Sequence, residues 1–241
     1  MKILLIAGHG AGDSGACGNG YREADLTREM VSLIREQMVV RGIECDIANT
    51  SINWFDRIRT IGVPFAHYDQ LLEIHFNSGG GHGTELFTPT SRSASDVERN
   101  ILSNICAVTG YTNRGVKQKN FTVIASCAKK IDKTALLEVC FIDSASDVAI
   151  YQQKKNSIAK AVAAAFAPES EETKMVEDLK KRIEALEAES KRKNEILYLI
   201  GEDIQTLFNA VESGNKEDLR QNDIINIVGG EIADLKRGAE K

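Results

Sequence analysis

Apolar runs short enough for single strands alternate with stretches of helical periodicity through the first two thirds of this 241-residue chain. Strands are expected at residues 2–7, 44–48, 70–77, 84–88, 121–124 and 135–142. Helices are expected at residues 24–39, 95–108 and 146–166, where apolar side chains recur every three or four residues. This alternation predicts an α/β domain whose sheet is covered by helices on both faces.

The amino-acid composition changes after residue 167, which we take as the end of the first domain. Pro168 stops the preceding helix, and the polar residues 168–173 are typical of a linker. Residues 174–241 form a third segment, in which a seven-residue apolar repeat begins. The two apolar positions of that repeat hold Val176, Ile183, Leu197, Ile204 and Val211, and Leu179, Leu186, Ile200 and Leu207. The pattern predicts a small all-α region with coiled-coil heptads.

Two polar residues, Ser190 and Lys193, interrupt this repeat and either set its register or mark a turn between two helices. We expect the helices to self-associate, which would make the protein a homo-oligomer. The alternative is an amphipathic hairpin folded on itself or on the first domain. In residues 222–238 the aliphatic side chains lie too close together for a heptad repeat, and the pattern assigns them no role.

Composition excludes several classes of function. A net charge of -5 gives no general attraction to nucleic acid, and no apolar run approaches the roughly 20 residues that membrane insertion requires. Gly8, His9 and Gly10 interrupt the first apolar run, so we expect a strand there and no signal peptide. The five cysteines are scattered and form no Cys-x-x-Cys pair, which favours free thiols in a reducing compartment.

The loop after the first strand is rich in glycine and joins two polar side chains, His9 and Glu23. It lacks the Gly-Lys-Ser/Thr ending of a phosphate loop, and acidic residues open the next helix, so its charge is wrong for phosphate. An imidazole and a carboxylate are instead ordinary ligands of zinc. The glycines would let the loop fold back and bring His9 and Glu23 together around a metal ion.

A third ligand is expected from the strand at residues 70–77. His75 lies near its carboxyl end, where functional groups of α/β sheets gather, and strand alternation places Glu73 and Asn77 on the same side. His82, in the following glycine-rich turn, is kept as a substitute ligand or a substrate contact. His67 precedes the strand and is expected to be structural or exposed.

One acidic residue, Glu138, lies inside a run that otherwise resembles a buried strand. An unpaired buried carboxylate is costly, so it needs a partner or a place at the open end of the strand. A water molecule activated by zinc becomes a usable nucleophile when a carboxylate can accept its proton. We therefore expect Glu138 to be the catalytic base.

Four segments together resemble the zinc-dependent N-acetylmuramoyl-L-alanine amidases of the amidase-3 family. They are GHGAGDSGACGNGYREADL, EIHFNSGGGHGTELF, NRGVKQKNFTVI and ALLEVCFIDSASDV. The resemblance implies a mixed twisted sheet of about six strands flanked by helices. It also implies that His9, Glu23 and His75 hold Zn²⁺ and that Glu138 is catalytic.

The resemblance further implies hydrolysis of the amide between N-acetylmuramic acid and L-alanine in peptidoglycan, and so cell-wall lysis. Arg114 and Lys117 could contact carboxylates of the stem peptide, with Asn77 and His82 as further substrate contacts. The chain departs from the family at Ile6-Ala7, where Asp-Pro is usual, and at Cys140, where Gly is frequent. Neither departure removes an expected metal ligand.

In its expected lack of a signal peptide, the chain resembles a phage or prophage endolysin. Such an enzyme is made in the bacterial cytoplasm and reaches the wall through a separate pore or after lysis, and a bacterial autolysin could share this property. In that setting the C-terminal region would bind the wall, assemble the enzyme or do both. Two alternatives stay open: a zinc peptidase that cuts the stem peptide, and a non-catalytic wall-binding or scaffold protein.

Overall fold

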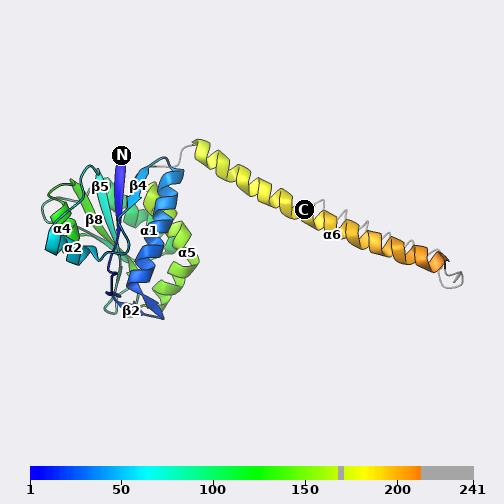
Figure 1. The fold of residues 1–241 in the computed structure, drawn as a ribbon, viewed down its shortest axis with the longest axis horizontal. Coiled ribbons are helices and arrows are strands. Elements are labelled where there is room, and N and C mark those ends of the chain that lie inside the picture. The colour runs from blue at the N-terminus through cyan, green and yellow to red at the C-terminus, as the bar shows by residue number, and fades with distance from the viewer. Residues whose placement is uncertain (168–170, 213–241) are drawn as a thin grey trace. The chain divides into compact units, whose positions relative to one another are not determined.

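The computed structural model describes residues 1–167 and 171–212, which fall into two compact units, Met1–Thr173 and Lys174–Lys241 (Figure 1). The strands of the main sheet are β1 (Lys2–Ala7), β4 (Glu44–Ile47), β5 (Gln70–Asn77), β6 (Thr84–Thr88), β7 (Asn113–Gln118) and β8 (Lys133–Phe141). Two short strands, β2 (Cys17–Gly18) and β3 (Tyr21–Arg22), pair separately. The helices are α1 (Glu23–Val40), α2 (Trp54–Ile61), α3 (Asp96–Thr109), α4 (Thr122–Cys127), α5 (Ala145–Ala164) and α6 (Glu171–Glu212).

The main sheet has the strand order β4-β1-β5-β8-β6-β7 and is mixed. Strands β4, β1, β5 and β8 run parallel to one another, whereas β6 pairs antiparallel with β8 and parallel with β7. The predicted α/β class with about six strands is therefore confirmed. Because β1, β5 and β8 are parallel neighbours, their carboxyl ends meet at one edge of the sheet.

The two faces of the sheet are buried against different helices. Ile3, Leu5 and the same-face side chains of β5 and β8 pack in one core cluster with residues of α1, α3 and α5. The alternate residues Leu4, Ile6 and Leu71 pack with residues of α2 and α4 in a second cluster. The side chains of His75 and Glu138 share the parity of this second face, so any site they form opens between α2 and α4.

One predicted strand is wrong. Residues 121–124 were expected to be extended because they are apolar and mostly β-branched or aromatic, but Thr122–Cys127 form the helix α4. Val123, Ile124 and Cys127 are buried in the second core cluster at helical spacing, so burial of this face outweighs the β propensity of the residues. The strand in this region is β7, and it precedes the predicted position.

Helix α6 continues without a break through the polar residues of the heptad repeat, so Ser190 and Lys193 do not mark a turn. Its apolar residues Leu179, Ile183 and Leu186 are exposed. Residues 222–238, for which the sequence assigned no role, lie outside the described residues. In the described part of the chain no helix is long and apolar enough to cross a membrane.

Candidate metal centre

Three side chains with metal-binding atoms meet at the carboxyl edge of the sheet. His9 follows β1, Glu23 is the first residue of α1, and His75 lies near the end of β5. One potential ligand atom from each of the three lies within 4.8 Å of the others. The three residues predicted as metal ligands are thus brought together, although their ligation itself stays a prediction.

The close approach of these groups depends on two glycines. A Cβ atom on Gly8 would lie 2.3 Å from the His75 ring, and one on Gly15 would lie 2.7 Å from both His9 and Glu23. Gly15 has a φ of +63°, which favours glycine independently of the space. The loop is therefore rich in glycine partly because its backbone passes directly beside the imidazole rings.

Glu23 is the shared centre of the cluster. Its Oε1 lies 2.9 Å from His75 Nδ1 and its Oε2 lies 3.1 Å from His9 Nε2. The Glu23 side chain is 5% exposed. Burial alone would raise the pKa of Glu23, but hydrogen bonds from His75 and His9 outweigh it and hold the pKa well below the usual carboxyl range. The residue is therefore an anion at the start of α1, where the helix dipole also favours negative charge.

The outer nitrogen of each imidazole faces a second carboxylate. His9 Nδ1 lies 2.8 Å from Asp13 Oδ2, and His75 Nε2 lies 3.1 Å from Glu73 Oε1. Burial opposes the charged form of both rings, but their carboxylate partners outweigh it and raise the pKa of each. Sequence reasoning missed the role of Asp13, whereas Glu73 was placed on the side of His75 without a function.

Glu138 lies opposite His75 in the register of the parallel strands β5 and β8. Its Oε2 atom is buried and has no hydrogen-bond partner. Burial raises the pKa of Glu138 to about 7, since desolvation outweighs the attraction of His75. A carboxyl group with this environment can exchange a proton near neutral pH, which is the property expected of a general base.

All six of these acidic and basic residues line one cavity of about 480 Å³. Trp54 and Phe55 of α2 line it together with Phe121, which immediately precedes α4. Asn53 also lines the cavity, caps α2 and donates a hydrogen bond to Asp13. The cavity therefore has an acidic floor at the sheet edge and aromatic side chains beside it.

Three predicted substrate contacts are tied to a residue that the sequence analysis did not single out, Glu85 of β6. Asn77 Nδ2 donates to Glu85 Oε1, while Arg114 Nε lies 3.1 Å from Glu85 Oε2 and Lys117 donates to the same oxygen. Asn77 lines the cavity, whereas Arg114 and Lys117 do not. Their roles as substrate contacts stay predictions.

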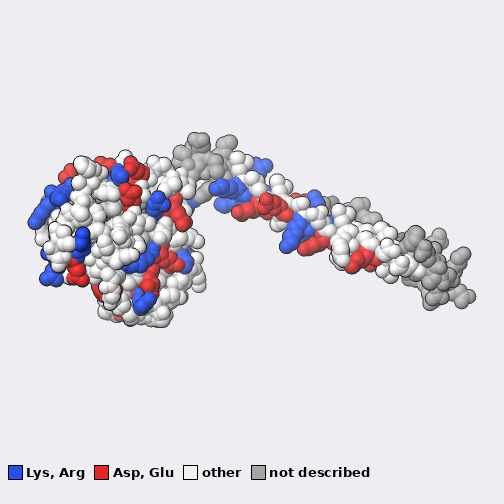
Figure 2. Space-filling model, in the orientation of Figure 1, with Lys and Arg blue, Asp and Glu red and all other residues white. Residues whose placement is uncertain are grey.

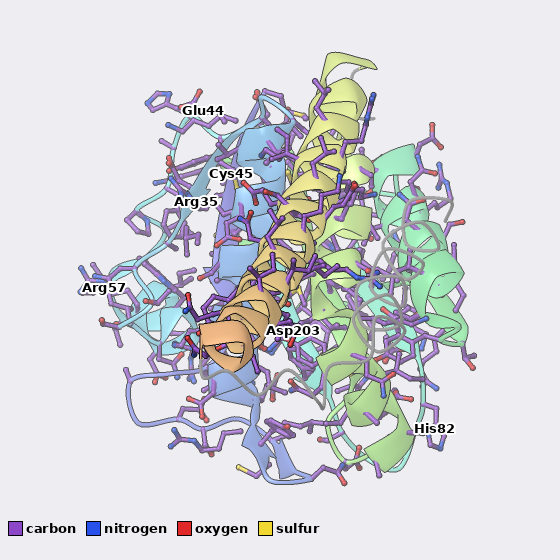
Figure 3. The ribbon with its side chains drawn as sticks, turned by 90° about the vertical axis from the view of Figure 1, so that its right-hand side faces the viewer. Arg35, Glu44, Cys45, Arg57, His82 and Asp203 are labelled. Atoms are coloured by element: carbon purple, nitrogen blue, oxygen red, sulfur yellow. The ribbon has the colours of Figure 1, made fainter. Side chains whose placement is uncertain are left out.

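His82 lies away from the three candidate metal ligands His9, Glu23 and His75. Its side chain is 65% exposed, and its Nδ1 atom lies 2.8 Å from Ser144 Oγ at the start of α5. Figure 3 shows His82 at the periphery of the first unit. The donor cluster of the described residues does not include it, so its use as a substitute ligand is not supported.

The chemistry of the donor set fits Zn²⁺. Two imidazoles and one carboxylate are a common set of three protein ligands in catalytic zinc sites, which leave a further position for water or substrate. The carboxylate oxygen of Glu138, buried without a partner, lies beside them. The residues present are therefore those that a hydrolytic zinc site requires.

This fold and donor set define a class, that of α/β domains with a candidate metal centre beside a buried carboxylic acid. Residues 3–167 match the amidase-3 family, described as N-acetylmuramoyl-L-alanine amidase, and the chain belongs to this family. The family resemblance found in the sequence is thus confirmed.

Individual relatives agree with this membership. The chain is 31% identical over 152 residues to the sporulation-specific N-acetylmuramoyl-L-alanine amidase of Bacillus subtilis, a match covering 61% of this chain and 58% of that protein. It is 27% identical over 175 residues to the endolysin of Bacillus phage SPP1, covering 68% and 63% of the two. The chain thus spans less than two thirds of these curated relatives.

A solved structure supports the fold. The catalytic domain of CwlV, an N-acetylmuramoyl-L-alanine amidase from Bacillus (Paenibacillus) polymyxa var. colistinus, matches with a TM-score of 0.54 at 24% identity. The match covers 69% of this chain and 96% of that domain.

Proposed function

We propose that the protein is a zinc-dependent N-acetylmuramoyl-L-alanine amidase that degrades bacterial cell walls. The observation that carries the proposal is the convergence of His9, Glu23 and His75 within 4.8 Å beside Glu138. This arrangement occurs in a domain of the amidase-3 family. The substrate would be the amide that joins the lactyl group of N-acetylmuramic acid to the L-alanine of the stem peptide.

In the reaction that we propose, His9, Glu23 and His75 would hold Zn²⁺. The bound ion would supply Lewis acidity toward a carbonyl oxygen and toward water. Glu138 accepts a proton from the attacking water as the oxygen bonds to the carbonyl carbon. It then delivers that proton to the alanine nitrogen as the C–N bond breaks, leaving a lactyl carboxyl group and a free amino terminus.

Substrate binding would use the cavity and its margin. The aromatic side chains Trp54, Phe55 and Phe121 offer apolar surface to the substrate beside the reacting groups. Arg114 is 33% and Lys117 44% exposed, so both keep free N–H groups for a carboxylate of the stem peptide.

The decisive test is digestion of purified Gram-positive cell walls with and without a chelator, followed by identification of the new amino termini. We expect chelator-sensitive release of N-terminal L-alanine. Release of another amino terminus would instead support a zinc peptidase that cuts within the stem peptide. If zinc is bound and walls of several chemotypes release nothing, the protein is a wall-binding or scaffold protein and the proposal is wrong.

We also propose that α6 joins copies of this chain in a coiled coil. Leu179, Ile183, Leu186, Leu197 and Ile204 occupy heptad positions and are between 46% and 64% exposed. An isolated helix gains little from such side chains unless a partner covers them. Sedimentation equilibrium should show an oligomer that Leu186→Asp dissociates, whereas Glu184→Asp, outside the apolar positions, leaves it intact. A monomeric wild-type protein would refute this part.

For the biological setting we propose an endolysin, made in the bacterial cytoplasm and released to the wall by a separate pore or by lysis. The similarity to a phage endolysin supports this setting. Figure 2 shows acidic and basic side chains interspersed over the visible face of the first unit. An extended basic surface of the kind that binds nucleic acid is not seen on that face. Expression inside a susceptible host should leave cells intact until a pore-forming protein is co-expressed. Lysis without that protein would overturn the proposal.

A further inference from the structure

Glu73 is a buried carboxylate that the proposed reaction does not use. It lies on β5 two residues before His75, its side chain is 6% exposed, and it lines the cavity. Its Oε2 atom is buried and has no hydrogen-bond partner. A carboxylate buried in this way costs folding free energy, so packing alone does not account for a glutamate at this position.

The other oxygen of Glu73 contacts the candidate ligand His75, whose ring is held at both nitrogens. Nδ1 lies 2.9 Å from Glu23 Oε1, and Nε2 lies 3.1 Å from Glu73 Oε1. A neutral imidazole carries a hydrogen on one nitrogen only, and the other must be free of hydrogen to bind a metal. In the neutral ring, therefore, either Nδ1 donates to Glu23 or Nε2 donates to Glu73, but not both.

The neighbouring ligand indicates which nitrogen is free. His9 has the same arrangement, with Nε2 facing Glu23 and Nδ1 facing Asp13. The His9 and His75 rings lie with centroids 4.9 Å apart, and in both the nitrogen toward the shared Glu23 points into the cluster. The outward nitrogens, His9 Nδ1 and His75 Nε2, each contact a carboxylate outside the three candidate ligands. This carboxylate is Asp13 for His9 and Glu73 for His75.

We propose that Glu73 is a positioning residue that fixes the tautomer and orientation of His75. Its Oε1 accepts a hydrogen bond from His75 Nε2–H, so that Nδ1, the nitrogen beside Glu23, is free of hydrogen when a cation is held between these groups. A carboxylate on the outer nitrogen of a ligand histidine also increases the basicity of the ligand nitrogen. The inference rests on the metal site of the proposed function.

The first test leaves Glu73 and the candidate ligands unchanged. The protein has only four histidines, so the imidazole ¹⁵N signals of the zinc-loaded wild type can be assigned with the help of His67→Asn and His82→Asn. We expect the signals of His75 to show a protonated Nε2 and a zinc-bound Nδ1. A protonated Nδ1 with zinc on Nε2 would overturn the inference.

The second test measures zinc affinity by competition with a chromophoric chelator. Glu73→Leu removes the acceptor and should weaken zinc binding by about 10- to 100-fold. Glu73→Gln keeps a side-chain oxygen that can accept from Nε2–H and should restore most of the affinity. Glu98→Gln is the matched control, a buried glutamate near the opposite end of β5, and should leave zinc affinity unchanged.

The outcomes separate this inference from the proposed function. If the wild type binds no zinc, the metal site fails and the inference with it. If the wild type binds zinc and Glu73→Leu binds it within twofold, only the inference fails. If Glu73→Gln loses as much affinity as Glu73→Leu, the charge of Glu73 acts directly on the metal and the positioning role is wrong. If Glu73→Leu does not fold, the ¹⁵N signals of the wild type decide.

Discussion

Replacing Glu138 by glutamine tests the proposed reaction with little disturbance of the fold. The two side chains have nearly the same shape, and Glu138 Oε2 has no hydrogen-bond partner that the substitution would break. Glu138 is not one of the three candidate ligands, so we expect these to keep their places. The change therefore removes the ability to accept a proton while leaving the donor cluster intact.

The expected magnitudes follow from this environment. A positioned general base contributes about 10²- to 10⁴-fold to a rate, which corresponds to about 3–5 kcal/mol of transition-state stabilisation. Removing the charge of Glu138 gives up the attraction of His75 but also removes the larger cost of burying a carboxylate. We expect the free energy of unfolding of Glu138→Gln to lie within about 1 kcal/mol of the wild type or above it.

The assay combines the release of N-terminal alanine from walls, urea unfolding and zinc content. Glu138→Gln should keep zinc and stability but lose activity, whereas His75→Ala should lose both zinc and activity. Glu98→Gln should show the opposite pattern to Glu138→Gln: Glu98 is fully buried and accepts hydrogen bonds from Arg92 and Ser95, so stability should fall by about 1–3 kcal/mol with activity retained. Lysis by Glu138→Gln within tenfold of the wild-type rate would refute the catalytic assignment.

Two further predictions concern stability. Burial would raise the pKa of Glu98, but hydrogen bonds from Arg92 and Ser95 outweigh it and lower the pKa below the ordinary value of 4.5. The stability that Glu98 contributes should therefore be present above pH 4.5 and be lost as pH falls through the lowered pKa, so the difference between wild type and Glu98→Gln in urea unfolding should shrink in acid. Free Zn²⁺ at 100 times its Kd should raise the free energy of unfolding by about 2.7 kcal/mol, and a chelator or His75→Ala should abolish the gain.

The sequence predicts the strands that carry the candidate site better than the segments that cover them. Strands β5 and β6 have the predicted bounds because each is a short apolar run ended by glycine or a polar residue. His75 and Glu138 were identifiable because polar side chains in buried strands require a reason. Residues 121–124 were mispredicted because a short apolar run does not distinguish a strand from a buried helical turn.

The residues around the candidate ligands were harder to predict, because their roles depend on contacts between distant segments. Asp13 contacts His9 within the first loop, but Glu85 meets Arg114 and Lys117 across 29 and 32 residues. Strand alternation shows that Glu73 shares a side with His75, yet only the register and rotamers show that its oxygen faces Nε2. A sequence pattern indicates which face of a strand or helix a side chain occupies. Contacts between distant segments form only in the folded domain, so the pattern does not predict them.

The distribution of charge explains how the proposed substrate would be oriented. Four acidic residues, Asp13, Glu23, Glu73 and Glu138, line the cavity, and its described lining contains no lysine or arginine. Such a cavity favours a cation and disfavours the carboxylates of a stem peptide. A neutral amide can enter beside Glu138, while anionic groups are expected to remain at the margin, where Asn77 connects the cavity to Glu85 and its two basic partners. The acidic residues in and around the candidate metal centre would thus also favour an uncharged bond for cleavage.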